Sequence, residues 1–174
     1  GILSIGVGLK GAATFGAMFH AINHSLSKAM LFLVAGNILA IYQTKSIQDV
    51  KGLIRIQPLS GLLWVTGLLA ITGSPPFGTF LSEFTILKTA LEQNRWGIAI
   101  AYLCFLGLIF IGMSRSMLGM AQGEVLELPQ NVVVRKAVLI PPAILGLLSL
   151  FLGLYIPPPL AHLLHTAASV LGGF

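Results

Sequence analysis

The chain has 174 residues, of which 56% are hydrophobic and only 9% charged, against roughly 25% charged residues in an ordinary soluble domain. Its mean hydropathy of +0.93 excludes a typical soluble enzyme, because a water-soluble domain of this size must still cover its surface with polar groups. The net charge of +5 does not indicate nucleic-acid binding, since most basic residues lie between apolar runs, where they act as topology signals.

The first apolar stretch, residues 1–9, is too short to cross a membrane. As a helix it would extend about 13 Å, whereas the hydrocarbon layer is about 30 Å thick. Because the chain begins with Gly1 rather than Met, we expect a truncated start. The basic segment and small-residue cleavage site of a signal peptide are not recognisable here. The first full span is expected at 13–41, followed by a polar connection at 42–57.

The next apolar stretch begins at Pro58 and is interrupted by the sequence GSPPFG at residues 73–78. Two prolines bracketed by glycines cannot sustain a helical hydrogen-bond ladder. We therefore predict a helix break, with a second helical piece from about 77 to 91. The residues assigned to the break are Gly73, Pro75, Pro76 and Gly78.

Two further spans complete the chain. One is expected at 96–120 and is followed by a polar loop at 122–131; the other follows Arg135 and Lys136 and ends near Tyr155. Prolines then stop this span, and the tail at 160–174 is expected to be a short amphipathic piece. The predicted fold is an all-α, polytopic transmembrane helical bundle of about four spans, including the broken helix. Residues 1–174 are expected to form a single transmembrane domain.

The orientation depends on whether residues 58–91 cross the membrane once or return as a hairpin. A single crossing would place five basic residues on one side and two on the other: Lys45, Lys51, Arg55, Arg135 and Lys136 against Lys10 and Arg95. The positive-inside rule then makes the first side cytoplasmic and places the C-terminus outside. A hairpin would move Arg95 and the later loops.

Ionisable residues occur inside the first span. His20, His24 and Lys28 recur at every fourth position, so each step turns only about 40° around the helix and the three side chains form one stripe. Lys28 lies near the middle of the span, where a charge costs roughly 3 kcal/mol on insertion scales. We therefore expect the stripe to face protein or water and to have a function. Purely structural hydrogen bonds between helices, or metal binding by the two histidines, are the alternatives.

Glu83 lies seven residues after Pro76, among apolar neighbours. Desolvation at this depth favours the uncharged forms of carboxylates and lysines, which brings both toward proton exchange near neutral pH. The unwound backbone beside it offers carbonyls, amides and room for water. These features predict a proton relay through Lys28, His24, His20 and Glu83. The alternative is that Glu83 is a static partner of a cation on another helix.

Two sequence motifs resemble those of a known family. HAINHSLSKAMLFLVAGNI, followed after a basic loop by GSPPFGTFLSEFTIL, resembles the antiporter-like subunits shared by respiratory complex I, Mrp-type cation/proton antiporters and group 4 membrane-bound hydrogenases. The match extends from the first residues to about residue 121. The acidic Glu83 is similar to the hydrogenase-type and middle complex I subunits, whereas the distal complex I subunit carries lysine there. GLYIPPPL near the end resembles the hydrogenase-4 or formate hydrogenlyase type.

The resemblance implies roles for the residues singled out above. Members of the family carry two inverted repeats, each with a broken helix, linked by a hydrated line of charged residues. Lys28 matches the central lysine of the second repeat, His20 and His24 the accompanying histidines, and Glu83 the charged residue on the second broken helix. The first repeat is absent from this chain, so the resemblance implies the C-terminal half of such a subunit, as a fragment or as one of two chains.

By this resemblance the chain is a non-catalytic, multi-pass subunit of an energy-converting oxidoreductase complex in the inner membrane of a prokaryote, which relays protons or exchanges them for sodium. Its expected partners are the lipid bilayer, other membrane subunits and a peripheral redox arm with nickel-iron or flavin and iron-sulfur centres. The single cysteine, Cys104, provides no ligand set for a redox cluster or metal, and no cofactor is expected in this chain. A stand-alone Mrp-type antiporter subunit and a purely structural scaffold are the alternatives.

Overall fold

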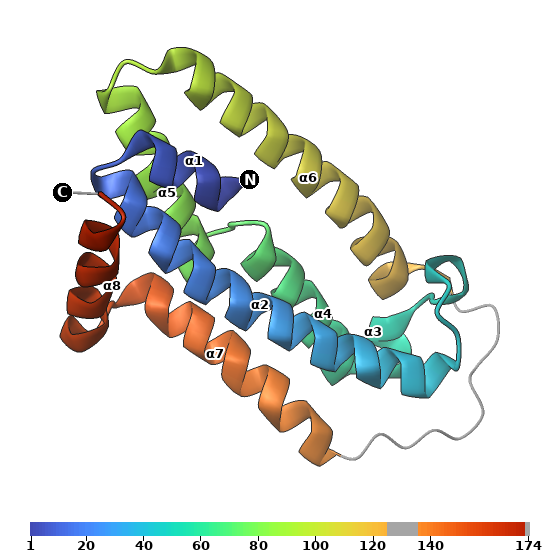
Figure 1. Cartoon of the computed structure of the whole chain (residues 1–174). Helices are drawn as coiled ribbons and strands as arrows, with labels where there is room; N and C mark the ends of the chain where they lie inside the picture. Colours follow the sequence, from blue (N-terminus) through green and yellow to red (C-terminus); the bar gives the residue numbers. More distant parts are fainter. Residues whose placement is uncertain (125–135, 173–174) are drawn as a thin grey trace.

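The computed structural model describes residues 1–124 and 136–172, and the regular elements in these ranges are helices. Figure 1 shows their arrangement. In chain order they are α1 (Ile2–Leu9), α2 (Ala12–Tyr42), α3 (Leu53–Ile56), α4 (Pro58–Ile71), α5 (Gly78–Glu92), α6 (Trp96–Gln122), α7 (Ile140–Leu154) and α8 (Pro158–Val170), with 3-10 turns at Ile47–Asp49 and Lys136–Leu139. Arg135 and most of the loop expected at 122–131 lie outside the described residues.

Within the described ranges, three helical segments are long and apolar enough to cross a membrane: α2, α6, and residues 137–154, which end with α7. α4 is apolar but has only 14 residues, about 21 Å at ~1.5 Å per residue, so it cannot cross alone. α5 continues the crossing beyond a break at residues 72–77. The predicted helical membrane bundle with one broken span is therefore confirmed.

The broken span crosses once and does not return as a hairpin. α4 and α5 follow one another in the same direction along α2 (Figure 1). Gln93, just after α5, donates from Nε2 to the carbonyl of Leu9 at 2.8 Å, at the end where α1 leads into α2. Trp64 of α4 donates from Nε1 to the carbonyl of Met117, near the other end of the bundle, at 3.2 Å. Lys45, Lys51 and Arg55 consequently lie at the opposite end from Lys10 and Arg95.

α2 is the central helix and packs against α1, α4, α5, α7 and α8. Its buried apolar side chains contribute to clusters along the bundle. Phe19 packs with Leu152 of α7 and Leu164 of α8, while Val34 packs with Leu53 of α3. The long central helix therefore holds the broken span on one side and α7 and α8 on another.

Two short segments are more ordered than their sequences indicated. The polar connection at 42–57 contains α3, because Leu53 is fully buried against the end of α2. The tail helix α8 begins at Pro158 rather than at residue 160, since proline is favourable in the first turn of a helix, where its missing amide hydrogen has no intrahelical partner.

Candidate functional site

The break between α4 and α5 exposes backbone groups inside the bundle. Pro75 and Pro76 have no amide hydrogen, so the carbonyls of Ile71 and Thr72 lack the donors that a continuous helix would supply four residues later. The Thr79 hydroxyl closes part of the gap by donating to the carbonyl of Ala70. The break extends over residues 72–77 and contains Gly73, Pro75 and Pro76, whereas Gly78, which the sequence also assigned to the break, is the first residue of α5.

Neighbouring helices hold the break in place. Gly153 of α7 packs directly on the backbone from Pro76 to Gly78, so closely that a Cβ atom there would overlap it. From α2, the Asn23 side chain lies against Gly78 in the same way. The unwound segment is therefore a packed feature of the fold, supported from two sides.

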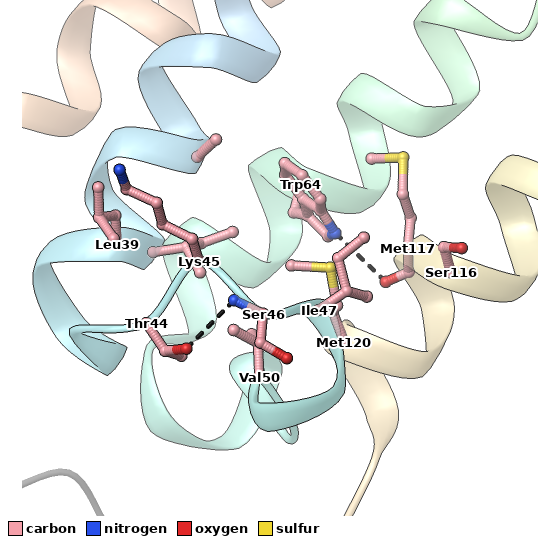
Figure 2. Close-up of a pocket in the computed structure, with 12 residues that line it drawn as sticks. Leu39, Thr44, Lys45, Ser46, Ile47, Val50, Trp64, Ser116, Met117 and Met120 are labelled. Atoms are coloured by element: carbon pink, nitrogen blue, oxygen red, sulfur yellow. Dashed lines mark hydrogen bonds between the residues drawn. The ribbon is translucent and has the colours of Figure 1, made fainter.

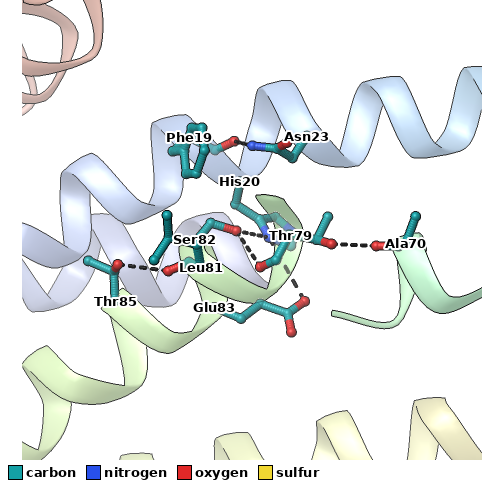
Figure 3. Close-up of polar contacts among 9 residues, drawn as sticks. All are labelled: Phe19, His20, Asn23, Ala70, Thr79, Leu81, Ser82, Glu83 and Thr85. Carbon is teal, nitrogen blue, oxygen red and sulfur yellow. Dashed lines mark hydrogen bonds and ion pairs between the residues drawn. The ribbon is translucent and has the colours of Figure 1, made fainter. Parts of the chain in front are cut away.

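Glu83 extends from α5 toward this break (Figure 3). The residue is only 7% exposed. Its carboxylate lies against Gly73, which has a φ of +66° and no room for a Cβ atom. Its Oε1 is 3.9 Å from Nδ1 of His20 on α2, which is too long for a direct hydrogen bond; the two groups form an ion pair only when the imidazole is protonated.

His20 is anchored to α5 by Ser82, 62 residues further along the chain. The Ser82 hydroxyl donates to the carbonyl of Thr79 at 2.7 Å, and its oxygen is 3.0 Å from His20 Nδ1. Because a hydroxyl has a single hydrogen, the imidazole must be the donor in the second bond, with the proton on Nδ1. In a neutral ring, Nε2 is then the nitrogen available to accept a proton.

The stripe on α2 runs from a buried to an exposed position. His20 is 4% exposed, His24 is half-buried and Lys28 is exposed. The two imidazole rings are stacked, with centroids 5.3 Å apart. Lys28 lies with its Nζ 5.9 Å from the centre of the Phe32 ring, and within the described residues no carboxylate is within 4.0 Å of it. The structure thus groups Glu83, His20 and His24, and places Lys28 at the open end of the stripe.

Lys28 lines a cavity of about 250 Å³ between α2, α4 and α6. A second cavity, of about 460 Å³, shares Ala35, Trp64 and Met117 with the first. It extends to the loop after α2, where Lys45 and Ser46 form part of its wall (Figure 2). The exposed end of the stripe therefore faces the more basic end of the bundle.

A third cavity, of about 410 Å³, lies on the other side of Glu83. Residues 72–75 of the break form one wall, and Tyr102 of α6 contributes to the lining. Tyr102 is 4% exposed, and its hydroxyl has no hydrogen-bond partner within the described chain. Sequence reasoning missed Tyr102, because a tyrosine among apolar residues of a span is not distinguished from a packing residue. Its hydroxyl, about two helical turns into the span, was the available signal.

Other polar atoms buried in the bundle interior also lack protein partners. They include Asn23 Oδ1 and Ser27 Oγ on α2, Ser60 Oγ on α4 and Ser149 Oγ on α7. Buried polar groups without protein partners are the usual binding places of internal water. Among the residues with described placement there is no group of three or more histidine, cysteine, aspartate or glutamate side chains that could hold a metal ion.

These features define a class of protein: a polytopic membrane subunit in which a discontinuous helix carries a buried carboxylate and packs against a helix with a stripe of ionisable side chains. The comparison with family models identifies the family. Residues 1–114 match the model described as NADH:quinone oxidoreductase/Mrp antiporter, TM. The chain belongs to this family, and the resemblance carried by its two motifs is confirmed.

Individual relatives come from two kinds of complex. The chain is 32% identical over 162 residues to the hydrogenase-4 component F homologue of Methylacidiphilum infernorum (isolate V4), covering 91% of this chain and 33% of the relative. It is 30% identical over 156 residues to a Na⁺/H⁺ antiporter subunit of Bacillus subtilis (strain 168), covering 88% and 32%. The chain therefore spans about a third of the length of these relatives.

The fold also matches a solved structure. A chain of the Mrp complex from Dietzia sp. DQ12-45-1b superposes with a TM-score of 0.84 at 21% identity, covering 97% of this chain and 40% of that one. At this identity the match establishes the fold alone.

Proposed function

We propose that this chain is a proton-translocating membrane subunit of an energy-converting oxidoreductase complex in the inner membrane of a prokaryote. The complex would be a membrane-bound hydrogenase or a complex I-like NADH:quinone oxidoreductase. The observation that carries the proposal is the placement of Glu83 beside His20, at an unwound helix, in a chain of this family. Residues 1–174 would form one domain, comprising the second inverted repeat and the C-terminal helices of the subunit.

The proton path follows the order of burial along α2. A proton enters at Lys28 from the cavities toward the basic end and passes to His24 and then His20, each one helical turn further. Imidazole suits this role because one nitrogen can accept a proton while the other releases one. The 3.9 Å between His20 Nδ1 and Glu83 Oε1 is closed by a small side-chain movement or a bridging water. Glu83 then releases the proton into the cavity beside the break.

Coupling to the redox reaction would be electrostatic. A unit charge that appears in a neighbouring subunit about 10 Å from Glu83 changes its energy by roughly 1.7 kcal/mol at an effective dielectric constant of about 20. That energy corresponds to a change of about 18-fold in the ratio of protonated to ionised carboxyl. Movement of charge in one subunit can therefore load or unload the relay in the next without a large conformational change.

The redox chemistry would belong to partners. These are other membrane subunits and a peripheral arm bearing nickel-iron or flavin and iron-sulfur centres, while this chain binds no redox cofactor. In this proposal the chain itself is non-catalytic; its one cysteine, Cys104, is exposed on α6.

The second candidate function is a stand-alone Mrp-type cation/proton antiporter subunit. It is favoured by the similarity to the Bacillus subtilis antiporter protein and by the fold shared with the Mrp complex chain. The two functions differ in their energy source. Proton movement driven by a redox substrate supports the first, and movement driven by a sodium gradient alone supports the second.

The test uses Glu83→Gln and Lys28→Ala in the complete protein, assayed in inverted membrane vesicles with a pH-sensitive dye. Glu92→Gln and Lys88→Ala are the matched controls, because this exposed pair lies on the same α5 helix as Glu83, 3.6 Å apart. We expect both relay variants to lose most coupled proton movement while the complex remains assembled on native gels, and both controls to retain it. Undiminished proton movement in the two relay variants would refute the assignment, and loss of assembly would favour a static role for Glu83.

A further inference from the structure

Two adjoining cavities form a groove between α2, α4 and α6. The cavity of about 250 Å³ lies beside Lys28, and the cavity of about 460 Å³ extends to the loop after α2; both are lined by Ala35, Trp64 and Met117. Tyr42, the last residue of α2, lies 14 residues after Lys28, which is about 21 Å at ~1.5 Å per residue. This length is a little more than half of the ~30 Å hydrocarbon layer, so the groove has the depth of one membrane leaflet.

The walls of the groove are apolar and adaptable. The wider cavity is lined by aliphatic side chains such as Ile38 and Val50, together with Met117 and Met120. Flexible thioethers of this kind fit ligands of irregular shape. Trp64 is held in place by the hydrogen bond that its Nε1 donates to the carbonyl of Met117 at 3.2 Å. Cavities with apolar walls stay dry and bind apolar molecules, and an acyl chain is the apolar molecule that a membrane supplies.

The mouth of the groove is cationic. Lys45 forms part of the wall of the wider cavity (Figure 2), and Lys51 and Arg55 follow it on the same connection. The carboxylate of Asp49 accepts a hydrogen bond from the Thr44 hydroxyl at 3.1 Å. Within residues 1–124 and 136–172, no carboxylate lies within 4.0 Å of the three basic groups. Basic pockets between membrane helices on the cytoplasmic side bind anionic lipid head groups, which are complementary to these charges.

We propose that this groove binds one acyl chain of an anionic phospholipid, with the phosphate beside Lys45 and the end of the chain near Lys28. A lipid can enter the groove from the bilayer without leaving its own leaflet, because the mouth lies at the membrane surface and the groove is one leaflet deep. A membrane helix is too large for the groove. At a diameter of ~10 Å and a length of ~21 Å, a helix occupies on the order of 1,600 Å³, against cavities of about 460 and 250 Å³.

A bound acyl chain would also regulate the proton relay. The end of the chain takes the space through which water and a proton reach Lys28, so occupancy of the groove slows proton entry and release of the chain restores it. This consequence rests on the proposed function, whereas the lipid site itself does not.

The test measures quenching of tryptophan fluorescence by brominated lipids, with the purified complete protein in phosphatidylcholine bilayers. Bromine is carried on the acyl chains of a small, equal fraction of either phosphatidylglycerol or phosphatidylcholine. We expect stronger quenching by brominated phosphatidylglycerol, because the groove selects the anionic lipid and brings its chain to Trp64. Trp64→Phe should remove this excess. Trp96→Phe is the matched control and should retain it, because Trp96 is exposed at the other end of α6.

Two further variants test the head-group end and the acyl-chain end separately. Lys45→Gln should weaken the preference for phosphatidylglycerol about fivefold, whereas Lys10→Gln, exposed at the opposite end of the bundle, should leave it unchanged. Ala35→Phe places a ring where the two cavities meet and should abolish the excess quenching. Ala29→Phe is its control, because Ala29 is exposed on the same helix.

Three results would overturn the lipid site. They are equal quenching by the two brominated lipids in the wild type, an excess that survives in Ala35→Phe, and selective quenching by brominated oleate alone, which would assign the groove to a free fatty acid. If Ala35→Phe does not fold, the comparison of Lys45→Gln with Lys10→Gln decides, and equal preference in these two variants also overturns the site.

Proton movement in vesicles with and without phosphatidylglycerol tests the regulation. We expect phosphatidylglycerol to slow the wild type more than Lys45→Gln, and an equal effect on both would overturn the regulation of proton entry. If Glu83→Gln stops proton movement while the wild type shows no preference for phosphatidylglycerol, the relay stands and the lipid site falls. If phosphatidylglycerol binds as described while Glu83→Gln retains proton movement, the proposed function falls and the lipid site stands.

Discussion

The Ser82 hydroxyl is the contact that orients His20 toward α5, and its removal should be costly. Ser82 is fully buried; it accepts a hydrogen bond from His20 Nδ1 at 3.0 Å and donates to the carbonyl of Thr79 at 2.7 Å. Ser82→Ala leaves the buried imidazole N–H without a partner, which costs about 1–3 kcal/mol. We expect the free energy of unfolding to fall by that amount.

The same change should slow proton transfer, because His20 loses the bond that holds its proton on Nδ1. If about 1.4 kcal/mol of that penalty raises the barrier for transfer, proton movement falls about tenfold. The assays are unfolding of the purified complete protein by sodium dodecyl sulfate, and proton movement in vesicles. Ser82→Thr retains a hydroxyl and should restore much of the activity.

Ser25→Ala is the matched control. Ser25 lies on α2, is exposed, and donates to the carbonyl of Ala21 at 2.7 Å, so its loss should change the unfolding free energy by no more than about 0.5 kcal/mol. The reasoning would be refuted if Ser82→Ala were as mild as Ser25→Ala and left proton movement at the wild-type level.

Two further predictions concern the glycines that contact the break. In the vesicle assay, Gly73→Ala should reduce proton movement nearly as much as Glu83→Gln, because the added Cβ atom would displace the Glu83 carboxylate and an alanine in the left-handed backbone conformation costs roughly 1–2 kcal/mol more. The control is Gly97→Ala, because an added Cβ atom at Gly97 would lie in open space. Wild-type activity in Gly73→Ala would contradict the placement of Glu83. Gly153→Val should destabilise the fold by about 1–3 kcal/mol or more and lower the yield of monodisperse protein, because the added side chain would overlap the backbone of the break. Gly107→Val should leave the yield unchanged, because a side chain added at Gly107 would lie in open space. Equal yields of the two variants would show that α7 does not support the break.

Much of the candidate site was predictable because it is local. The spacing of His20, His24 and Lys28 defines a stripe on any α-helix, whatever surrounds it. The prolines at 75 and 76 interrupt a helix for the same reason in any fold, since they lack an amide hydrogen. The two motifs around these residues were sufficient to indicate the family, which the match over residues 1–114 confirmed.

The contacts between side chains on different helices were not predictable from the sequence, because they depend on how the helices pack. Nothing in the spacing of His20 and Ser82, 62 residues apart, required the hydrogen bond between them. Likewise, Tyr102 resembled an ordinary aromatic residue of a span until α6 was placed beside the break. Lys28 lies near the middle of α2, but the packing of the other helices leaves its side chain exposed, whereas His20 of the same stripe is buried.

The sequence by itself determined the apolar spans, the interruption at residues 73–78 and the line of ionisable side chains, because each follows from composition or from the geometry of one helix. Only the tertiary structure decided that the broken span crosses once, and that its carboxylate lies between a histidine of α2 and a cavity bounded by α6. Those relations arise where helices approach closely, as at Gly153, and close approach depends on how all the side chains pack together.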